Sequence, residues 1–258
     1  MASPWFRRTR IGILLGVLAV VGADAWSTKR RVQKWTEPLP IRVHPIAAEP
    51  SAEAYVQAMT LEAFGALAPF FEREAHRFQV YGSPVVDVSL GEWVSSLPPA
   101  APQTAGFLSA IDFSLRLRLW AWRHAGSHDG PRVFVIYHPP QEGQVLDHSY
   151  GLPEGLIGVV HAFASPSAEG SNQVVIAHEV LHTVGATDKY DESGQPIYPD
   201  GYADPGQQPP LPQPRAELMA GRIPISPTEA RIPSSLEECV VNEATAREIR
   251  WIWRAEGE

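Results

Sequence analysis

His178-Glu179-Val180-Leu181-His182 lies within an apolar helical pattern that predicts a helix from about residue 172 to 186. Two histidines four residues apart lie on one face of a helix, one turn apart, so both imidazoles can reach a single metal ion. The glutamate beside the first histidine is placed to hold and deprotonate a water on that metal. The apolar flanks favour a zinc site over a chance match on a solvated helix.

The residues after this motif offer a helix end and a third ligand. Gly185 can adopt the left-handed conformation that closes a helix without steric cost. Asp188 follows three residues later with an anionic oxygen. We expect His178, His182 and Asp188 to bind one catalytic zinc ion, with Glu179 as the general base. For Asp188 two alternatives stay open, a turn cap or a calcium ligand together with Asp191.

The surrounding sequence alternates between strand and helix patterns. Strands are predicted at residues 41–46, 85–90, 132–137 and 155–163, and further helices at residues 51–78, 104–124 and 242–253. The helix at 104–124 is expected to have a broad apolar side made of Phe107, Leu108, Ile111, Leu115, Leu119 and Trp122. Between Thr187 and about Pro233 many of the chain's 25 prolines predict long, stiffened loops.

Composition places the chain in the ordinary globular class, with 44% hydrophobic and 19% charged residues. The net charge of −8 is unevenly distributed, because residues 1–34 are basic and contain only one of the 29 acidic residues. An acidic globular part is a poor partner for nucleic acid, whose binding depends on phosphate neutralisation. The single cysteine, Cys239, excludes an intramolecular disulfide and is expected to be an inert thiol.

The N-terminus has the pattern of an export signal. An uncharged apolar run, residues 11–23, follows three arginines, and Ala23-Asp24-Ala25 offers a cleavage site. The run is short for a transmembrane helix, which needs about 18 residues or more. We therefore expect either a cleaved signal peptide, which gives a secreted or periplasmic protein, or an uncleaved transmembrane anchor within residues 11–25 that tethers an exported domain to the membrane.

The motif resembles that of the metzincin zinc metallopeptidases, H-E-x-x-H-x-x-G-x-x-H/D, at every defining position from His178 to Asp188. The resemblance implies an α+β, metzincin-like zincin fold. Its parts are a mixed twisted sheet with a long backing helix and an active-site helix, then an irregular proline-rich C-terminal subdomain with a terminal helix. It also implies a methionine in a tight turn beneath the zinc, and Met219 in Leu218-Met219-Ala220-Gly221 fits that turn. No cysteine-switch propeptide is visible.

The expected organisation is a signal peptide or signal anchor at residues 1–25, a linker at 26–40 and a metallopeptidase domain at 41–258. Within that domain, residues 41–186 form the N-terminal subdomain and residues 187–258 the C-terminal one. The expected activity is hydrolysis of a protein or peptide substrate outside the cytoplasm.

The loop after Asp188 contains further candidates. Tyr190, Tyr198 and Tyr202 are candidate stabilisers of the oxyanion of a tetrahedral intermediate, with loop packing as the alternative. Lys189, the only lysine after residue 34, is expected to be a solvated surface residue, with Asp188 or Asp191 as alternative partners. Asp191, Asp200 and Asp204 offer carboxylates for a structural calcium ion, although their spacing matches no calcium motif.

Two other functions remain open from the sequence. In a gluzincin-type zinc hydrolase the third ligand is a glutamate on a later helix, and Glu243 or Glu217 would take that role. In a non-catalytic binding module the zinc would serve as a structural staple. Structural zinc sites usually have four protein ligands, and the chain has no cysteine pair to complete one.

Overall fold

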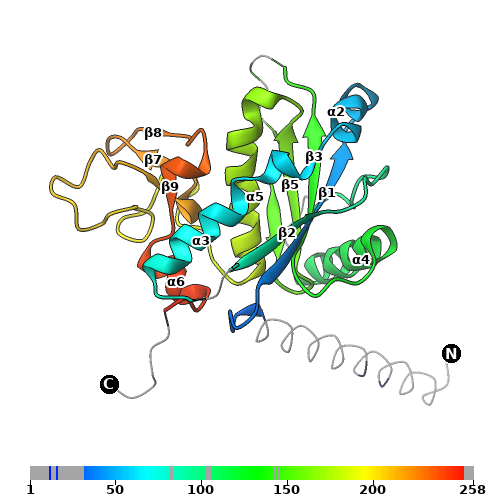
Figure 1. Ribbon diagram of the computed structural model, residues 1–258, viewed down its shortest axis with the longest axis horizontal. Helices are drawn as coiled ribbons and strands as arrows, with labels where there is room; N and C mark the ends of the chain where they lie inside the picture. The colour runs from blue at the N-terminus through cyan, green and yellow to red at the C-terminus, as the bar shows by residue number, and fades with distance from the viewer. Residues whose placement is uncertain are drawn as a thin grey trace.

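The main sheet of the computed structural model has five strands in the order β2-β1-β3-β5-β4 (Figure 1). The structure describes residues 32–81, 84–102, 106–141, 143 and 146–252, together with Gly12 and Gly16. The strands are β1 (Leu39–Ala47), β2 (Val86–Leu90), β3 (Arg132–His138), β4 (Tyr150–Leu152) and β5 (Ile157–Phe163). Strand β4 runs antiparallel to β5 at one edge, and the other pairs are parallel. The fold is mixed α/β with a mixed sheet, which agrees with the expected α+β class.

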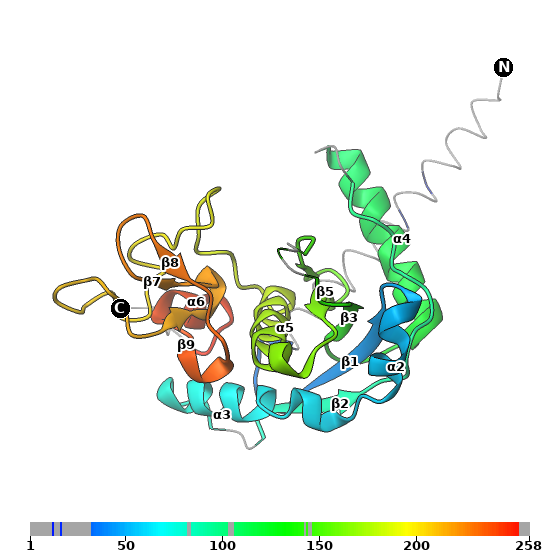
Figure 2. The ribbon, with the colours of Figure 1, turned by 90° about the horizontal axis from the view of Figure 1, so that it is seen from above.

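Helices cover both faces of this sheet. The helices are α2 (Glu53–Gln57), α3 (Leu67–Arg77), α4 (Phe107–Ala125), α5 (Glu169–Thr183) and, away from the sheet in the C-terminal part, α6 (Glu243–Glu248). Short 3-10 helices lie at Pro50–Ala52, Leu61–Phe64, Pro166–Ala168, Leu218–Ala220 and Leu236–Glu238. Figure 2 shows α4 on the side of the sheet opposite to α5. Strand β3 contributes to the hydrophobic core on both faces of the sheet. Val133 and Val135 pack with α3 and α5, while Phe134 and Ile136 pack with α4. A parallel strand buried on both faces explains why its sequence is almost continuously apolar.

The chain after α5 forms an irregular C-terminal part beside that helix, so that α5 lies between it and the sheet (Figures 1 and 2). Its regular elements, besides α6 and two of the 3-10 helices, are the short strands β6 (Ala216–Glu217), β7 (Ile223–Pro224), β8 (Ala230–Arg231) and β9 (Cys239–Val240). Cys239 is a buried free thiol, and burial raises its pKa to about 12, as expected for an inert cysteine.

The helix predicted at residues 51–78 is broken into several pieces. Helix α3 begins at Leu67, which places Pro69 in its first turn. Proline is tolerated there because the first-turn amides have no partner within the helix, whereas a continuous helix would place it in the interior. Pro69 therefore accounts for the start of α3 at Leu67, whereas the earlier break, where Thr60 is extended, has no such local cause.

The prediction of which side of the helix at 104–124 packs in the core is wrong. Leu108, Ile111, Leu115, Leu119 and Trp122 are exposed, and the sheet instead contacts Phe113, Leu117 and Ala121. The helix is apolar on two sides, so spacing could not decide which one faces the sheet. The buried side includes Ala121, which lets the helix backbone approach closely.

The expected transmembrane span is not supported. Among the residues that the structure describes, no helix combines the length and the apolar character needed to cross a bilayer. The membrane anchor expected within residues 11–25 is therefore withdrawn. Apart from Gly12 and Gly16, those residues lie outside the described part of the chain. The signal peptide and the exported location stay predictions.

We predict that Leu117→Ala lowers the free energy of unfolding by about 2–5 kcal/mol, because it opens a cavity between α4 and the sheet. Leu115→Ala is the matched control on the same helix, since Leu115 is 46% exposed, and should change stability by no more than about 0.5 kcal/mol. Urea unfolding of both variants provides the measurement. A larger loss in Leu115→Ala than in Leu117→Ala would mean that α4 packs through the other side.

Candidate metal centre

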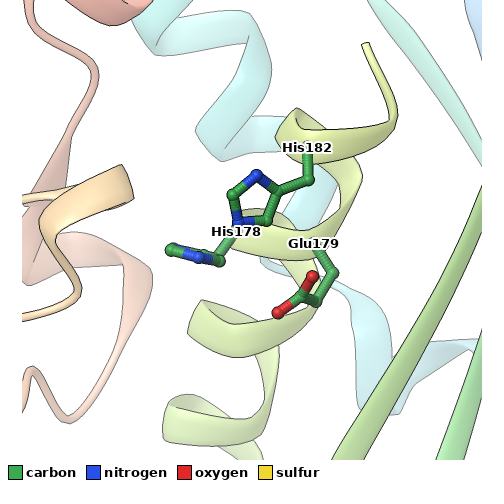
Figure 3. A group of neighbouring side chains, drawn as sticks. All are labelled: His178, Glu179 and His182. Atoms are coloured by element: carbon green, nitrogen blue, oxygen red, sulfur yellow. The ribbon is translucent and has the colours of Figure 1, made fainter. Parts of the chain in front are cut away.

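Helix α5 presents His178, Glu179 and His182 from consecutive turns (Figure 3). Each of the three offers a nitrogen or oxygen atom, and these atoms lie within 4.8 Å of one another. They form the one such group of three or more ligand-type side chains in the described part of the chain. Buried Val180 and Leu181 anchor the same helix in the core, so the motif lies on a rigid element.

The helix ends as the sequence predicts, through Gly185. This glycine has a φ of 108°, its N–H donates to the carbonyl of His182 at 3.1 Å, and the Ala186 N–H donates to the carbonyl of Leu181 at 3.0 Å. These two bonds are those of a Schellman motif. The chain therefore reverses within one turn of His182 and carries the following residues back past the histidines.

Two backbone carbonyls fix both imidazoles. Nδ1 of His178 donates to the carbonyl of Leu218 at 2.9 Å, and Nδ1 of His182 donates to the carbonyl of Ala186 at 2.9 Å. A carbonyl can only accept, so each Nδ1 bears the proton and each Nε2 is left as the nitrogen that can bind a metal. Such bonds also fix the ring orientation, as partners of metal-binding histidines commonly do.

Asp188 places a carboxylate oxygen beside the Nε2 atoms of both histidines. Its Oδ1 lies 3.1 Å from Nε2 of His178 and 3.1 Å from Nε2 of His182. Burial alone would raise the pKa of Asp188, but the two imidazoles outweigh it and hold that pKa well below its usual range. Burial likewise lowers the pKa of His178, but Asp188 and the charge of Glu179 outweigh it and raise that pKa. Two imidazole nitrogens and a carboxylate oxygen around one point are a donor set that suits zinc.

Glu179 is the side chain whose burial most requires explanation. It is 3% exposed, and its Oε2 has no hydrogen-bond partner among the described residues. Burial raises its pKa, although the nearby histidines oppose the shift. Buried carboxylate oxygens normally accept hydrogen bonds. An oxygen that accepts none, beside a donor set that suits zinc, is more typical of a carboxylate that acts on a bound ligand than of one that stabilises the fold.

Strand β4 passes close to this site and was not predicted. A side chain at Gly151 would place its Cβ 2.6 Å from Cβ of His182 and 3.4 Å from Oε2 of Glu179. Only glycine therefore allows the edge strand to approach α5 at this position. The three-residue strand is too short to give a periodic signal.

Met219 lies in a buried turn that connects two parts of the site. The turn consists of the 3-10 helix Leu218–Ala220 followed by Gly221 with a φ of 68°. The carbonyl of Leu218 holds His178, and the carbonyl of Met219 accepts from the backbone N–H of Lys189 at 3.0 Å. Met219 is fully buried in this turn, and its assignment as a methionine turn beneath the metal stays a prediction.

Of the three candidate tyrosines, the structure brings only Tyr190 to the site. Its ring stacks on His178 with 6.5 Å between centroids, and burial, followed by the charge of Asp188, raises its pKa to about 12. Tyr198 and Tyr202 instead contact each other, with 5.3 Å between ring centroids. Tyr198 is 59% exposed and donates to the carbonyl of Pro205.

The alternative third ligands lie elsewhere. Glu217 is fully buried, with Oε1 accepting from Oγ1 of Thr245 at 2.7 Å and Oε2 accepting from the N–H of Ala220 at 3.0 Å. Glu243 pairs with Arg247 on the exposed side of α6. The carboxylate within ion-pair distance of both histidines among the described residues is that of Asp188, not of Glu217 or Glu243.

The three aspartates considered for calcium form no such group in the part of the chain that the structure describes. Asp191 accepts hydrogen bonds from the backbone of Ser193 and Gln195, and Asp204 accepts one from Gly206. These bonds are those of turn-capping aspartates.

Lys189 is not the solvated surface residue that the sequence suggested. Its side chain is 6% exposed and pairs with Glu248 of α6 at 2.7 Å. Glu248 also contacts Thr187, so it holds both neighbours of Asp188. No local sequence signal connects these positions, which are about 60 residues apart.

Comparison with known proteins gives little further information. No protein-family model matches the chain, and no curated protein matches it. Among solved structures, wild-type OgpA from Akkermansia muciniphila is 13% identical with a TM-score of 0.34. Catalytically inactive OgpA in complex with an O-glycopeptide substrate, glycodrosocin, is 14% identical with a TM-score of 0.32. Each match covers 81% of this chain and 58% of the OgpA chain, and likeness at this level carries no functional argument.

The buried Glu217 predicts a pH dependence of stability. Burial raises its pKa from an ordinary 4.5 to about 7, against hydrogen bonds from Thr245 and backbone amides. Between these values the folded chain keeps a proton that the unfolded chain releases, so the free energy of unfolding falls as pH rises. Relative to Glu217→Gln, which cannot titrate, the wild-type chain should lose up to about 3 kcal/mol between pH 4.5 and 8. Urea unfolding with a chelator present tests this, and a pH-independent difference would mean that Glu217 is ionised throughout.

Proposed function

We propose that the chain is a zinc-dependent endopeptidase that uses Glu179 as its general base. The observation that supports this most directly is the convergence of two Nε2 atoms and Oδ1 of Asp188, next to a buried carboxylate oxygen of Glu179 that has no hydrogen-bond partner in the described part of the chain. His178, His182 and Asp188 would hold the ion. When bound, zinc supplies Lewis-acid chemistry, in which it polarises a carbonyl and makes water more acidic.

Glu179 would perform the proton transfers. Its Oε2 would take a proton from the attacking water and later deliver it to the leaving amine. Burial raises the pKa of this carboxyl toward the working range of a general base. Gly151 lets the backbone of β4 lie directly against Glu179 and His182, which would bring a substrate lying along β4 close to this carboxylate.

The edge position of β4 suits a peptide substrate. Strand β4 pairs with β5 on one side only, and no other strand in the described residues pairs with its outer edge. An extended peptide can add to such an edge through backbone hydrogen bonds. This arrangement would place a peptide next to Glu179 and His182, because Gly151 lies in the middle of β4.

The first test is the substitution of the base. Glu179→Gln should lower hydrolysis of an unstructured protein such as casein by roughly 10²–10⁴-fold, because proton transfer is lost. The zinc content should not change, since the proposed ligands are intact. Glu169→Gln at the start of the same helix is the control and should retain activity. Full activity in Glu179→Gln would refute the mechanism, and zinc without any cleavage in the wild-type chain would favour a structural staple.

The second test concerns the third ligand. Asp188→Ala should weaken zinc binding by roughly 100-fold or more, since removal of even a supporting residue costs about 10–100-fold. Glu243→Ala and Glu217→Gln should retain zinc, because neither carboxylate approaches the histidines. Zinc content is measured on each folded variant. Loss of zinc in Glu243→Ala or Glu217→Gln alone would support the gluzincin-type alternative instead.

A further inference from the structure

The two neighbours of Asp188 are both bound by one carboxylate, that of Glu248. Oε2 of Glu248 accepts from the backbone N–H of Thr187 at 2.8 Å, and Oε1 accepts from Oγ1 of Thr187 at 2.8 Å. Oε1 also accepts from Nζ of Lys189 at 2.7 Å. We refer to Glu248, Thr187 and Lys189 as the Glu248 clamp.

Every donor of the Lys189 ammonium has an acceptor within the Glu248 clamp. Nζ of Lys189 donates to the carbonyl of Thr187 at 2.9 Å, to Oγ1 of Thr187 at 2.7 Å and to Oε1 of Glu248. A lysine ammonium has three N–H donors, so all three have acceptors in this arrangement. The Lys189 side chain is only 6% exposed, so removal of one acceptor would leave a buried N–H donor without a hydrogen bond.

The backbone around the clamp is fixed as well. The N–H of Lys189 donates to the carbonyl of Met219, and the carbonyl of Lys189 accepts from the N–H of Ile197 at 2.8 Å. Helix α6, which carries Glu248, is capped by Asn242, whose amide also donates to the carbonyls of Asp200 and Tyr202. Glu248 is thus attached to a helix that is itself bonded to the loop after the site.

Asp188 needs such support because its own side chain is 42% exposed. The clamp binds the residues on either side of it from the direction of α6, while the carboxylate of Asp188 reaches the two histidines. A partly exposed carboxylate on an irregular segment would otherwise lose conformational freedom each time it bound a metal. A clamp that fixes the segment beforehand removes much of that cost.

We propose that Glu248 is a positioning residue that holds Asp188 in its metal-binding position through Thr187 and Lys189. The inference rests on the proposed zinc site. It assigns to the C-terminal helix a role in metal affinity, although no residue of that helix reaches the ligand atoms.

The test is the zinc dissociation constant of the full chain, measured by competition with a chromogenic chelator. Glu248→Gln replaces one acceptor oxygen by an NH₂ group that faces N–H donors, so it should weaken zinc binding by roughly 10–100-fold. Glu243→Gln makes the same chemical change on the exposed side of the same helix and should leave the constant unchanged. Circular dichroism of the zinc-free variants establishes that each is folded during the titration.

A pair of substitutions at Thr187 covers the case in which Glu248→Gln does not fold. Thr187→Val keeps the shape but removes Oγ1, and it should weaken zinc binding, whereas Thr187→Ser keeps the hydroxyl and should restore wild-type affinity. Folded Glu248→Gln or Thr187→Val with wild-type zinc affinity would overturn the positioning role. Asp188→Ala in the same assay separates the two proposals, because unchanged zinc binding in that variant would instead refute the ligand set.

Discussion

The reversal of the chain at Gly185 is the constraint on which the site depends. A helix can place two imidazoles on one face, but a third ligand must come from outside the helix. The positive φ of Gly185 closes α5 with two hydrogen bonds and returns the chain at once. The Ala186 carbonyl then lies where it accepts from His182, and Asp188 lies 3.1 Å from both imidazoles. A longer helix would carry Asp188 away from them.

Hydrogen bonding distinguishes Glu179 from two other buried carboxyl groups, those of Glu74 and Glu217. Glu74 and Glu217 are fully buried, yet each accepts hydrogen bonds from well-placed donors, Glu74 from Arg73, Arg77 and the N–H of Val241. Glu179 is almost as buried, and its Oε2 has no hydrogen-bond partner among the residues that the structure describes. A buried polar atom without a hydrogen-bond partner lowers the free energy of unfolding. Such an atom in a folded protein therefore calls for a functional explanation. Proton transfer at the proposed zinc site is such an explanation.

The C-terminal part, despite its few regular elements, contributes most of the support for this site. The carbonyls of Leu218 and Met219 bind His178 and the residue after Asp188, respectively. Glu217, in the strand before that turn, caps it by accepting from the N–H of Ala220. Residues 33 and 35 also contact this region, since Gln33 donates to the carbonyl of Val184 and Trp35 to that of Ile249. Segments distant in sequence therefore surround one helix end.

The sequence by itself determined the features that depend on local spacing. The i, i+4 histidines, the terminating Gly185 and the reach to Asp188 are consequences of helix geometry and of one glycine, and each is found in the structure. The central strands were also predictable, because β3 and β5 are apolar enough to be buried. These features need no knowledge of what lies across the fold.

Only the tertiary structure decided the rest, because those features depend on partners far along the chain. Whether Lys189 is solvated or buried depends on Glu248, 59 residues away, and the orientation of His178 depends on a carbonyl 40 residues away. The side of α4 that faces the sheet was undetermined because both sides are apolar. Backbone acceptors and a three-residue edge strand leave no periodic pattern in a sequence, so the surroundings of the motif became visible only in the fold.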